Sequence, residues 1–476
     1  MTDRKAATRQ RWLEVLAAHR QDWEKPGSEK YWSPALDTAS RDRLRAIQNA
    51  KLAAAAPFLY ENSPFYRHRF DRLGMTPDDL KTVDDLPKWP VVDKREMVED
   101  ALANPPWGTY TAHDDALWRE RGWMMFATSG TTGAPRIFRY TQIDRTYWEW
   151  ANARALYSMG IRKGDCVMMI TGFGPHVWIW GVNFGLARMG IAGIPGGGMD
   201  GRMRATFLDR YKPTVLACTP SYALYLGRTL QGMGIDPAAS SVKTIFLGGE
   251  PWMGIAATRK RLEALWGARS VEFYGCTEAS PHAGGYSCPA ALLPDGQVAT
   301  HLMEDVAIWE LVDGETKSPV PLGQRGLTVT TNLNSESSPQ LRFLVGDYTV
   351  LDTKPCACGR THARAIGSFV GRADDIVTLR GIKLYPTQIE EGVRAVPGIG
   401  DEYEIVLATQ PDGLDVMTIR VEHPAQPADA PKIAEQVAGE VRSRCEVRVG
   451  VEVLAPGTLP KTEFKAKRVR DTRRKA

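Results

Sequence analysis

The stretch Phe126-Ala-Thr-Ser-Gly-Thr-Thr-Gly-Ala-Pro135 decides how the rest of this chain is interpreted. Its six positions Thr128–Gly133 hold four hydroxyls and two glycines, directly after an apolar segment. Glycine lets backbone N–H groups point into one concavity, and small hydroxyls add donors that can follow phosphate oxygens. The alternative is a flexible surface loop of Ser, Thr and Gly. The segment therefore predicts a phosphate-binding loop, provided that other motifs support it.

From about residue 120 onward, short apolar segments alternate with helical patterns, which predicts an α/β architecture. In such a sheet, ligands bind at the polar or Gly-rich turns that follow the carboxyl ends of strands. The first hundred residues are mostly helical by pattern, with Arg41–Ala56 the clearest amphipathic helix, and we expect them to pack outside the sheet. The expected buried strands are Val167–Ile170, Val215–Cys218, Lys243–Leu247 and Val271–Tyr274.

The pattern changes after Arg372, where a second domain is expected to begin. Short hairpins alternate there with two helices. One helix is expected to begin at Pro386 and the other to span Lys432–Arg444. The expected hairpin strands are Ile376–Leu379 with Ile382–Tyr385, and Glu404–Ala408 with Met417–Val421. We therefore predict a large N-terminal domain with several strand–helix subdomains over residues 1–371, and a small mobile α+β C-terminal domain over residues 372–476.

Composition limits the class of protein. The 476 residues carry a formal net charge of only +4, without the basic stripe expected of a nucleic-acid-binding protein. The basic tail Lys461–Ala476 is either a solvated helix or frayed end, or a contact for an anion. The N-terminus lacks a signal-peptide core, and His176, Arg188 and several glycines interrupt the most apolar stretch, so we expect a cytoplasmic protein with no membrane span. Seven cysteines favour free thiols or metal ligands over disulfides.

Three further segments carry groups suited to a nucleotide. Tyr274-Gly-Cys-Thr-Glu278 offers a ring that can stack on a base and a carboxylate that can hold Mg²⁺. Asp347 follows the apolar run Leu341–Val345 and could accept hydrogen bonds from ribose hydroxyls. Lys465, near the C-terminus, could reach a phosphate when domains close. Each has an ordinary alternative: a strand-to-helix turn, a turn-capping Asp and a solvated basic tail.

In this order, the segments resemble the adenylate-forming acyl-CoA ligase superfamily and, within it, the phenylacetate-coenzyme A ligase branch. The matching segments lie between about residues 126 and 470. They are Thr128–Pro135 with Tyr140-Thr141, Gly248–Trp252, Tyr274–Glu278, Gly346-Asp347, Gly371–Asp375, Arg380-Gly381, Tyr385–Glu390 and the Lys465 segment.

The resemblance implies a reaction in two steps. A carboxylate attacks the α-phosphate of ATP to give an acyl-adenylate and pyrophosphate, and the thiol of coenzyme A then displaces AMP. The first step joins two anions, so the site must supply positive charge and alignment. The resemblance assigns Lys465 to bridge the carboxylate and the α-phosphate, Thr277 to contact that phosphate, and Glu278 to bind Mg²⁺.

The resemblance also assigns the remaining nucleotide contacts and the moving parts. Asp347 binds ribose, Arg372 reaches ribose or phosphate, Asp374 is the hinge, and Arg380 with Gly381 forms the face used for coenzyme A. The adenine slot is assigned to Gly249, Glu250 and Tyr274, and Gly275 is a further ATP/AMP-binding residue. The β- and γ-phosphates are assigned to Thr128, Ser129, Gly130, Thr131, Thr132 and Gly133.

Two positions depart from the family pattern. Ala134 stands where most relatives carry a lysine directly after the loop, and Arg136 lies two residues further on. Either Arg136 compensates for that lysine or the lysine is dispensable. Phe464 replaces the glycine that usually precedes the catalytic lysine, yet we assign the catalytic role to Lys465 ahead of Lys461 and Lys467.

The branch also suggests a metal. Three thiolates and one imidazole suit tetrahedral Zn²⁺, and four protein ligands would make it a structural site. The alternative is three buried reduced cysteines with a surface histidine. The four residues are Cys288, His301, Cys356 and Cys358.

The acid is the least determined part of the prediction. Aromatic residues after the strand Val167–Ile170 favour a flat aromatic acid of the phenylacetate, indoleacetate or benzoate type, although such tryptophans can also belong to the core. The predicted acyl pocket comprises Phe173, His176, Trp178, Gly248 and His282. Two alternatives stay open: loading of an aryl acid onto a carrier-protein thiol, and a non-catalytic nucleotide-binding relative. The sequence leaves the oligomeric state open, a homodimer included.

Overall fold

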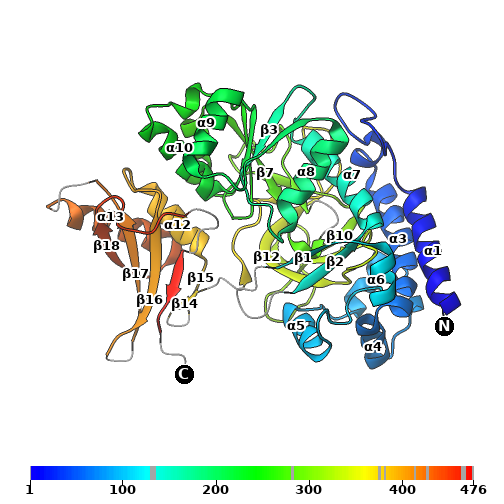
Figure 1. Ribbon diagram of the computed structural model, residues 1–476. Coiled ribbons are helices and arrows are strands. Elements are labelled where there is room, and N and C mark those ends of the chain that lie inside the picture. Colours follow the sequence, from blue (N-terminus) through cyan, green and yellow to red (C-terminus); the bar gives the residue numbers. More distant parts are fainter. Residues whose placement is uncertain are drawn as a thin grey trace. The chain divides into compact units, whose positions relative to one another are not determined.

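The computed structural model describes residues 2–128, 136–279, 284–373, 377–379, 382–411, 414–424, 428–462 and 468–473. Its secondary structure mixes helices and strands throughout, which confirms the predicted α/β class (Figure 1). The chain divides into two compact units. Unit 1 comprises Met1–Val167, Gly172–Ile194 and Val271–Ser368, and unit 2 comprises Met168–Thr171, Pro195–Ser270 and Phe369–Ala476.

Helices dominate the N-terminal part of unit 1. The helix predicted over Arg41–Ala56 extends to Asn62, and Ser40 caps it by accepting a hydrogen bond from the Arg43 N–H. It lies beside the first helix, where Trp12 stacks on Phe58 with ring centroids 5.0 Å apart (Figure 1). The helices are α1 (Thr2–Ala18), α2 (Pro34–Asp37), α3 (Arg41–Asn62), α4 (Pro64–Leu73), α5 (Lys94–Ala103), α6 (Asp115–Arg121), α7 (Gln142–Ser158) and α8 (Val177–Met189). Short 3₁₀ helices are η1 (Pro77–Asp79), η2 (Val83–Lys88) and η4 (Thr277–Ala279).

The sheet of unit 1 is built from neighbouring strands in the order β10-β11-β12-β13-β9-β8-β7, all antiparallel. Along β12, buried and half-buried residues alternate, as expected for a strand with one face on the core. The strands are β7 (Arg269–Tyr274), β8 (Gly285–Tyr286), β9 (Ala299–Leu302), β10 (Ala307–Val312), β11 (Arg325–Asn332), β12 (Phe343–Asp352) and β13 (Arg364–Ile366). A separate antiparallel pair joins β1 (Gly122–Ala127) to β2 (Ile137–Thr141).

The first part of unit 2 contains the parallel pair expected from the sequence. Strand β5 (Val215–Cys218) has the predicted bounds, and β6 (Thr244–Gly248) is displaced by one residue. The remaining elements are α9 (Gly201–Tyr211), α10 (Pro220–Gly232), η3 (Pro237–Ala239) and α11 (Ala256–Trp266). Strands β3 (Cys166–Met169) and β4 (Ala192–Pro195) contain residues of both units.

The C-terminal part of unit 2 is a small sheet with two helices. The predicted hairpin is confirmed as β16 (Tyr403–Thr409) and β17 (Asp415–Glu422), within a four-stranded sheet of order β18-β17-β16-β19. The other elements are β14 (Val377–Leu379), β15 (Ile382–Leu384), α12 (Pro386–Ala395), α13 (Ala430–Cys445), β18 (Gly450–Leu454) and β19 (Val469–Asp471). Strand β19 pairs in parallel with β16, so this part of the basic tail is neither a helix nor a frayed end.

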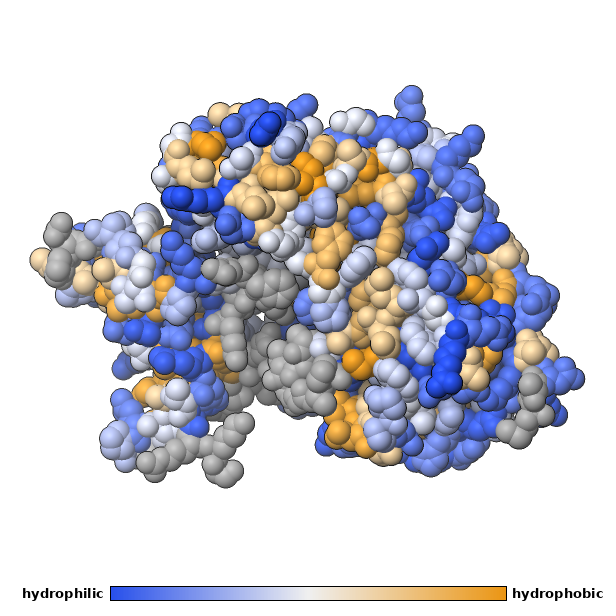
Figure 2. All heavy atoms as spheres, viewed as in Figure 1, coloured by the Kyte–Doolittle hydropathy of each residue, from blue (hydrophilic) through white to orange (hydrophobic). Residues whose placement is uncertain are grey.

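Within the described ranges, no helix is both long and apolar enough to cross a membrane. On the face seen in Figure 2, hydrophobic side chains are interspersed with hydrophilic ones. The most exposed large hydrophobic residues, Leu102, Leu322 and Leu292, come from separate segments.

Buried charges join the helical layer of unit 1 to its sheet. Arg154 of α7 is 1% exposed and donates to Asp37 at 2.9 Å and to Asp305 at 2.8 Å. Lys51 of α3 donates to the carbonyl oxygen of Asp305 at 2.5 Å, and burial lowers its pKa to about 8. One guanidinium therefore balances two buried carboxylates from distant parts of the sequence.

Replacing Arg154 with leucine is expected to lower the free energy of unfolding by about 3–5 kcal/mol, because two carboxylates would stay buried without their cation. Chemical denaturation followed by circular dichroism measures this change. The matched control is Arg45→Leu, which breaks the exposed pair with Asp84 and should cost about 1 kcal/mol or less. Equal effects of the two substitutions would contradict the prediction.

Candidate active site

Hydrogen bonds between Thr128 and Arg136 close the base of the predicted phosphate loop, which we call the loop neck. Ala127 of β1 pairs with Ile137 of β2. Just beyond this pair, the Thr128 N–H donates to the Arg136 carbonyl at 3.0 Å, and the Arg136 N–H donates to Thr128 Oγ1 at 3.1 Å. The two strand ends are thereby fixed relative to each other. The predicted phosphate contacts Ser129, Gly130, Thr131, Thr132 and Gly133 lie outside the described residues.

Glu278, the predicted magnesium ligand, pairs with Arg136. Nη2 of Arg136 lies 2.5 Å from Oε1 of Glu278, and the two side chains are only 5% and 7% exposed. The preceding residue, Thr277, accepts a hydrogen bond at its carbonyl from the Tyr140 hydroxyl at 2.9 Å. The short helix η4 is therefore attached to β2, and the structure brings Thr277 and Glu278 to the strand that closes the loop neck.

The predicted adenine and ribose residues of unit 1 are also adjacent. The Tyr274 hydroxyl at the end of β7 donates to Oδ2 of Asp347 on β12 at 2.6 Å. Asp347 is buried, and its carbonyl accepts a hydrogen bond from Thr328 at 2.9 Å. The Trp309 ring lies 6.3 Å from the Tyr274 ring, centroid to centroid. Trp309 had no sequence motif to mark it, because it is one residue of an ordinary strand.

Replacing Tyr274 with phenylalanine is expected to raise the KM for ATP about tenfold, because a lost hydrogen bond to a carboxylate is worth about 1.5 kcal/mol or more. The ring would remain available for stacking. Steady-state kinetics with ATP and 3′-deoxy-ATP measure the effect, and the penalty for the missing ribose hydroxyl should shrink in the variant. Tyr348→Phe, on the same strand as Asp347, is the control, and an unchanged KM in Tyr274→Phe would contradict the prediction.

Other predicted nucleotide residues lie in unit 2. Gly248 ends β6, and Gly249 adopts a left-handed φ of +85°, which glycine accepts without strain. Glu250 accepts hydrogen bonds from the backbone N–H and hydroxyl of Ser221, at 3.1 and 2.7 Å. Arg372 belongs to the same unit. Outside the described residues lie His282, Asp374, Arg380, Gly381 and Lys465.

The predicted acyl side of unit 1 is rich in half-buried aromatic rings. Phe173 meets Trp180 edge to face at 5.1 Å, and Trp180 stacks on Phe184 at 5.9 Å. Phe184 in turn meets Trp123 at 5.0 Å. His176 occupies the N-cap position of α8 without a side-chain capping hydrogen bond, and Trp178 lies in the first turn of the helix. Trp123 and Phe184 were missed in the sequence, because they lie on different elements and form a cluster only in the folded chain.

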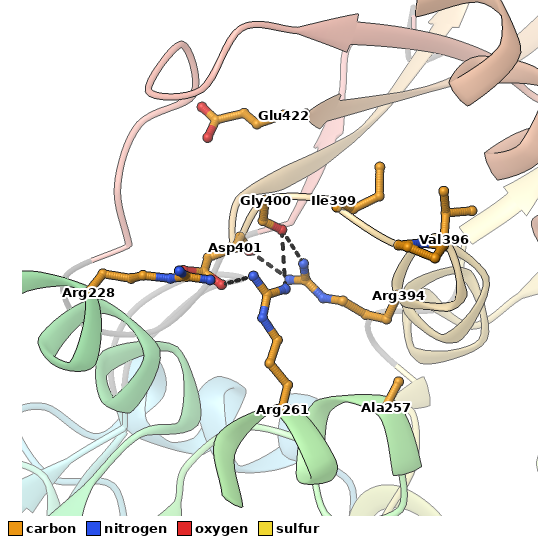
Figure 3. Close-up of a pocket in the computed structure, with 11 residues that line it drawn as sticks. Arg228, Ala257, Arg261, Arg394, Val396, Ile399, Gly400, Asp401 and Glu422 are labelled. Atoms are coloured by element: carbon orange, nitrogen blue, oxygen red, sulfur yellow. Dashed lines mark hydrogen bonds and ion pairs between the residues drawn. The ribbon is translucent and has the colours of Figure 1, made fainter. Parts of the chain in front are cut away.

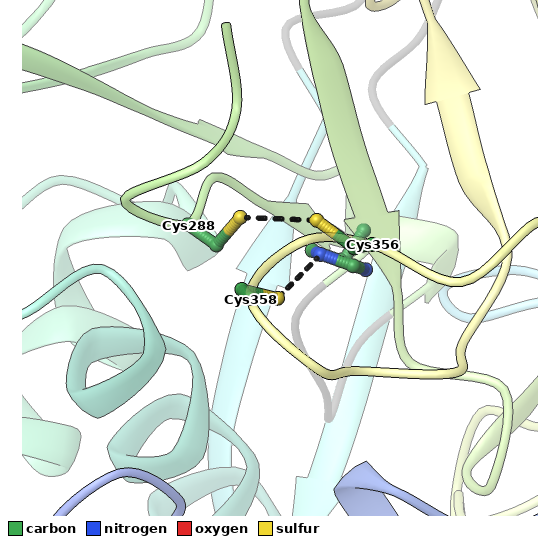
Figure 4. Close-up of side chains that lie close together, drawn as sticks. Cys288, Cys356 and Cys358 are labelled. Carbon is green, nitrogen blue, oxygen red and sulfur yellow. Dashed lines mark hydrogen bonds between the residues drawn. The ribbon is translucent and has the colours of Figure 1, made fainter. Parts of the chain in front are cut away.

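The predicted metal ligands converge. Cys288, His301, Cys356 and Cys358 are all buried, and their ligand atoms lie within 4.8 Å of one another (Figure 4). Cys288 Sγ lies 3.7 Å from Cys356 Sγ, and Cys358 Sγ lies 3.4 Å from His301 Nε2. His301 is a buried residue of β9, not the surface histidine of the alternative interpretation. The fold therefore places all four side chains around one point.

The geometry and the electrostatics of this cluster fit Zn²⁺. Zinc ligated by sulfur at about 2.3 Å and nitrogen at about 2.0 Å forms a tetrahedron with edges of about 3.5–3.8 Å, close to the separations of the two pairs. Hydrogen bonding by the Cys288 and Cys356 thiols holds the pKa of Cys358 well below its usual range. Hydrogen bonding with Cys356 and then with Cys358 raises the pKa of Cys288. A cluster that already favours one thiolate suits a soft divalent cation.

A cavity of about 550 Å³ in unit 2 lies apart from the predicted residues. Arg228 and Arg261 both point to Asp401, the former at 3.1 Å, while Arg394 binds the neighbouring carbonyl of Gly400 (Figure 3). Burial lowers the pKa of Arg261 to about 10, against the attraction of Asp401. The guanidinium groups are thus engaged within the protein.

The fold and these pairs define a nucleotide-binding enzyme of the adenylate-forming class. The chain belongs to the AMP-binding enzyme family, which matches residues 68–331, and the AMP-binding enzyme C-terminal domain matches residues 381–473. Within that family it belongs with the phenylacetate-coenzyme A ligase-like enzymes, as the curated relatives show.

The curated relatives match almost end to end. Phenylacetate-coenzyme A ligase of Thermus thermophilus is 32% identical over 463 residues, which cover 93% of this chain and 100% of the relative. The enzyme of the same name from Aromatoleum evansii is 33% identical, covering 92% and 97%. Among solved structures, 2-hydroxyisobutyryl-CoA ligase in its postadenylation state matches with a TM-score of 0.86 at 29% identity, covering 95% of this chain and 94% of that one.

Proposed function

We propose that this protein is an ATP-dependent acid–thiol ligase, which activates an aromatic carboxylic acid as acyl-adenylate and transfers it to coenzyme A. AMP and pyrophosphate are released. One observation carries the proposal: unit 1 joins Glu278 to the loop neck through Arg136, and Tyr274 to Asp347, in two buried polar pairs. Three of these residues are the ones that the resemblance assigns to metal, base and ribose. A non-catalytic relative would have no need to keep them paired.

Different polar groups of the site bind different parts of the nucleotide. Asp347, held by Tyr274 at one oxygen, accepts hydrogen bonds from ribose hydroxyls. Thr277 contacts the α-phosphate, and the loop Thr128–Gly133 grips the β- and γ-phosphates. Glu278 offers a hard oxygen ligand that fits Mg²⁺, which neutralises phosphate charge when bound. Lys465 bridges the acyl carboxylate and the α-phosphate, because two anions must approach each other there.

We further propose that residues 372–476 act as the mobile domain. Asp374 would be its hinge, Lys465 its adenylation residue, and Arg380 with Gly381 its face for the thiol step. The change of sequence pattern after Arg372 supports this boundary, as does the separate C-terminal domain match over residues 381–473. Domain rotation is a general way to exchange two catalytic faces.

The acid is proposed to be of the phenylacetate, indoleacetate or benzoate type. Relatives named for phenylacetate and for 2-hydroxyisobutyrate are similarly close, at 32–33% and 29% identity, so names alone do not separate an aromatic from a small aliphatic acid. The half-buried rings of Trp123, Phe173, Trp180 and Phe184 favour the aromatic acid. His176 and His282 would meet a polar ring substituent.

We also propose that the cluster of Cys288, His301, Cys356 and Cys358 holds a structural Zn²⁺. Four protein ligands leave no open position for catalysis, so the metal would join the segments that carry them. The cytoplasm remains the proposed location, and the seven free cysteines favour it.

A panel of acids tests the proposal directly. The purified protein would be incubated with ATP, Mg²⁺ and coenzyme A together with phenylacetate, indoleacetate, benzoate or 2-hydroxyisobutyrate, and AMP and thioester would be quantified by chromatography. We expect equal amounts of AMP and CoA-thioester with one of the aromatic acids. Thioester from 2-hydroxyisobutyrate alone would contradict the aromatic substrate. Adenylate that reacts only with a carrier-protein thiol would contradict coenzyme A, and no adenylate from any acid would contradict the enzyme.

A further inference from the structure

Arg136 lies in an enclosed position beside the proposed magnesium ligand. It is 4% exposed, and its guanidinium carbon lies 5.9 Å from the Phe138 ring and 5.6 Å from the Phe343 ring. Nη1 meets only the sulfur of Met97, at 4.0 Å, which is a weak acceptor. Nε is buried without an acceptor among the described residues. Among the described residues, the guanidinium therefore has one anionic partner, Glu278, and its other contacts are with apolar or weakly polar groups.

The ion pair uses only one oxygen of Glu278. Nη2 of Arg136 binds Oε1 at 2.5 Å, and Oε2 has no partner among the residues that the structure describes. Separating a desolvated ion pair costs electrostatic free energy, because each charge would stay buried without its partner. An apolar enclosure therefore holds the two side chains in one arrangement. The carboxylate is thus held with one oxygen occupied and the other free to bind a ligand.

The charge of Arg136 also bears on the family departure at Ala134. Without a loop lysine, an approaching triphosphate would meet Glu278 as an unbalanced negative charge. A guanidinium fixed at the loop neck removes that charge before the nucleotide arrives. The backbone of the same residue closes the neck with Thr128, so the main chain that carries this cation is fixed at the base of the loop.

We propose that Arg136 is a positioning residue for adenylation, which orients Glu278 through Oε1 and supplies the positive charge that the missing loop lysine would provide. This inference rests on the proposed function. It predicts two separable contributions. The charge favours binding of metal-free ATP, and the contact between Nη2 and Oε1 favours the additional binding that Mg²⁺ brings through Oε2.

Equilibrium binding of ATP tests the inference without relying on turnover. Isothermal titration calorimetry would give the Kd for ATP in EDTA and again in Mg²⁺, for the full-length protein and three variants. Arg136→Met should weaken metal-free ATP binding at least tenfold and reduce the gain from Mg²⁺ at least fivefold. Arg136→Lys keeps a point charge but not the planar fork, so it should keep metal-free binding within threefold while losing part of the gain from Mg²⁺. Glu278→Gln removes the proposed Mg²⁺ ligand, so it shows the smallest increase in ATP affinity expected on adding Mg²⁺.

The matched control is Arg139→Met. Arg139 lies on β2, three residues after Arg136, and is 2% exposed. It pairs with Asp115 at 2.9 Å and lies over the rings of Trp107 and Trp118. Its loss should lower stability in a similar way but leave both Kd values within twofold of wild type. Thermal melts of each variant show which proteins are folded.

The outcomes separate the inference from the proposed function. If Arg136→Met and Arg136→Lys both keep the wild-type Kd values while Glu278→Gln loses the Mg²⁺ gain, Arg136 is merely structural and the inference is wrong. Should Arg136→Met fail to fold, an unchanged Mg²⁺ gain in Arg136→Lys would also refute it. Wild-type protein that binds no ATP would instead refute the proposed function.

Discussion

Adenylate formation is expected to fall by about 100- to 1000-fold when Lys465 is replaced with alanine, the range typical for loss of one preorganised stabilising group. In the proposed first step, an acyl carboxylate attacks a negatively charged α-phosphate. A positive charge between them lowers the barrier, because charge builds up where no solvent is available to screen it. Exchange of labelled pyrophosphate into ATP measures this step alone.

The second step provides the internal control. Lys465→Ala should convert a synthetic acyl-adenylate to CoA-thioester within about twofold of the wild-type rate, because that step uses a different face of the small domain. Lys461→Ala and Lys467→Ala are the matched variants and should leave adenylation nearly unchanged. The assignment is wrong if Lys465→Ala keeps full adenylation activity, or if Lys461→Ala or Lys467→Ala loses it.

Loss of the cysteine–histidine cluster is expected to cause the largest fall in stability. Purified protein should contain about one zinc per chain, and Cys358→Ser should lose it, because a hydroxyl is a much poorer zinc ligand than a thiolate. Structural zinc contributes its binding free energy to folding, so the free energy of unfolding should fall by several kcal/mol. Elemental analysis and chemical denaturation measure the two effects.

Other buried thiols allow a matched comparison. Cys445→Ser changes a buried cysteine in the core of the small sheet of unit 2, which is not one of the four cluster residues. It should leave the metal content unchanged and cost far less stability than Cys358→Ser. Prolonged treatment of wild-type protein with a strong chelator should reproduce the Cys358→Ser effect. The metal site would be refuted if protein produced in zinc-containing medium contained no zinc after purification and Cys358→Ser were as stable as wild type.

The elements that could be predicted are those whose side chains are uniformly buried. Strands β5 and β6 are continuous apolar runs, as parallel strands covered on both faces are, and they were located to within one residue. Of strands β8 to β13, only β12 was indicated, by the apolar run Leu341–Val345, and it continues past Asp347 to Asp352. In β12, polar residues such as Asp347 and Thr349 interrupt the apolar ones, so the run between Phe343 and Asp352 is weakly apolar. Strand β19 was not predicted, because the arginines around it gave this segment the pattern of a solvated basic tail.

The candidate site could be predicted residue by residue but not pair by pair. Tyr274, Glu278 and Asp347 carry recognisable motifs, because their chemistry requires particular residue types next to glycine. The motifs do not show which of these residues contact one another. Tyr140 and Thr277 are 137 positions apart in the chain, and Tyr274 and Asp347 are 73 apart. Only tertiary packing brings such residues together, and the same holds for the rings of Trp123 and Phe184.

The closed neck between Thr128 and Arg136 has a consequence for how this loop can evolve. One residue fixes the frame of the loop with its backbone and neutralises Glu278 with its side chain. A mutation that removes the lysine after the last glycine is therefore tolerated where a cation is already fixed at the base of the loop. Substitutions at position 134 should be neutral in this lineage while Arg136 is present, and deleterious once it is lost.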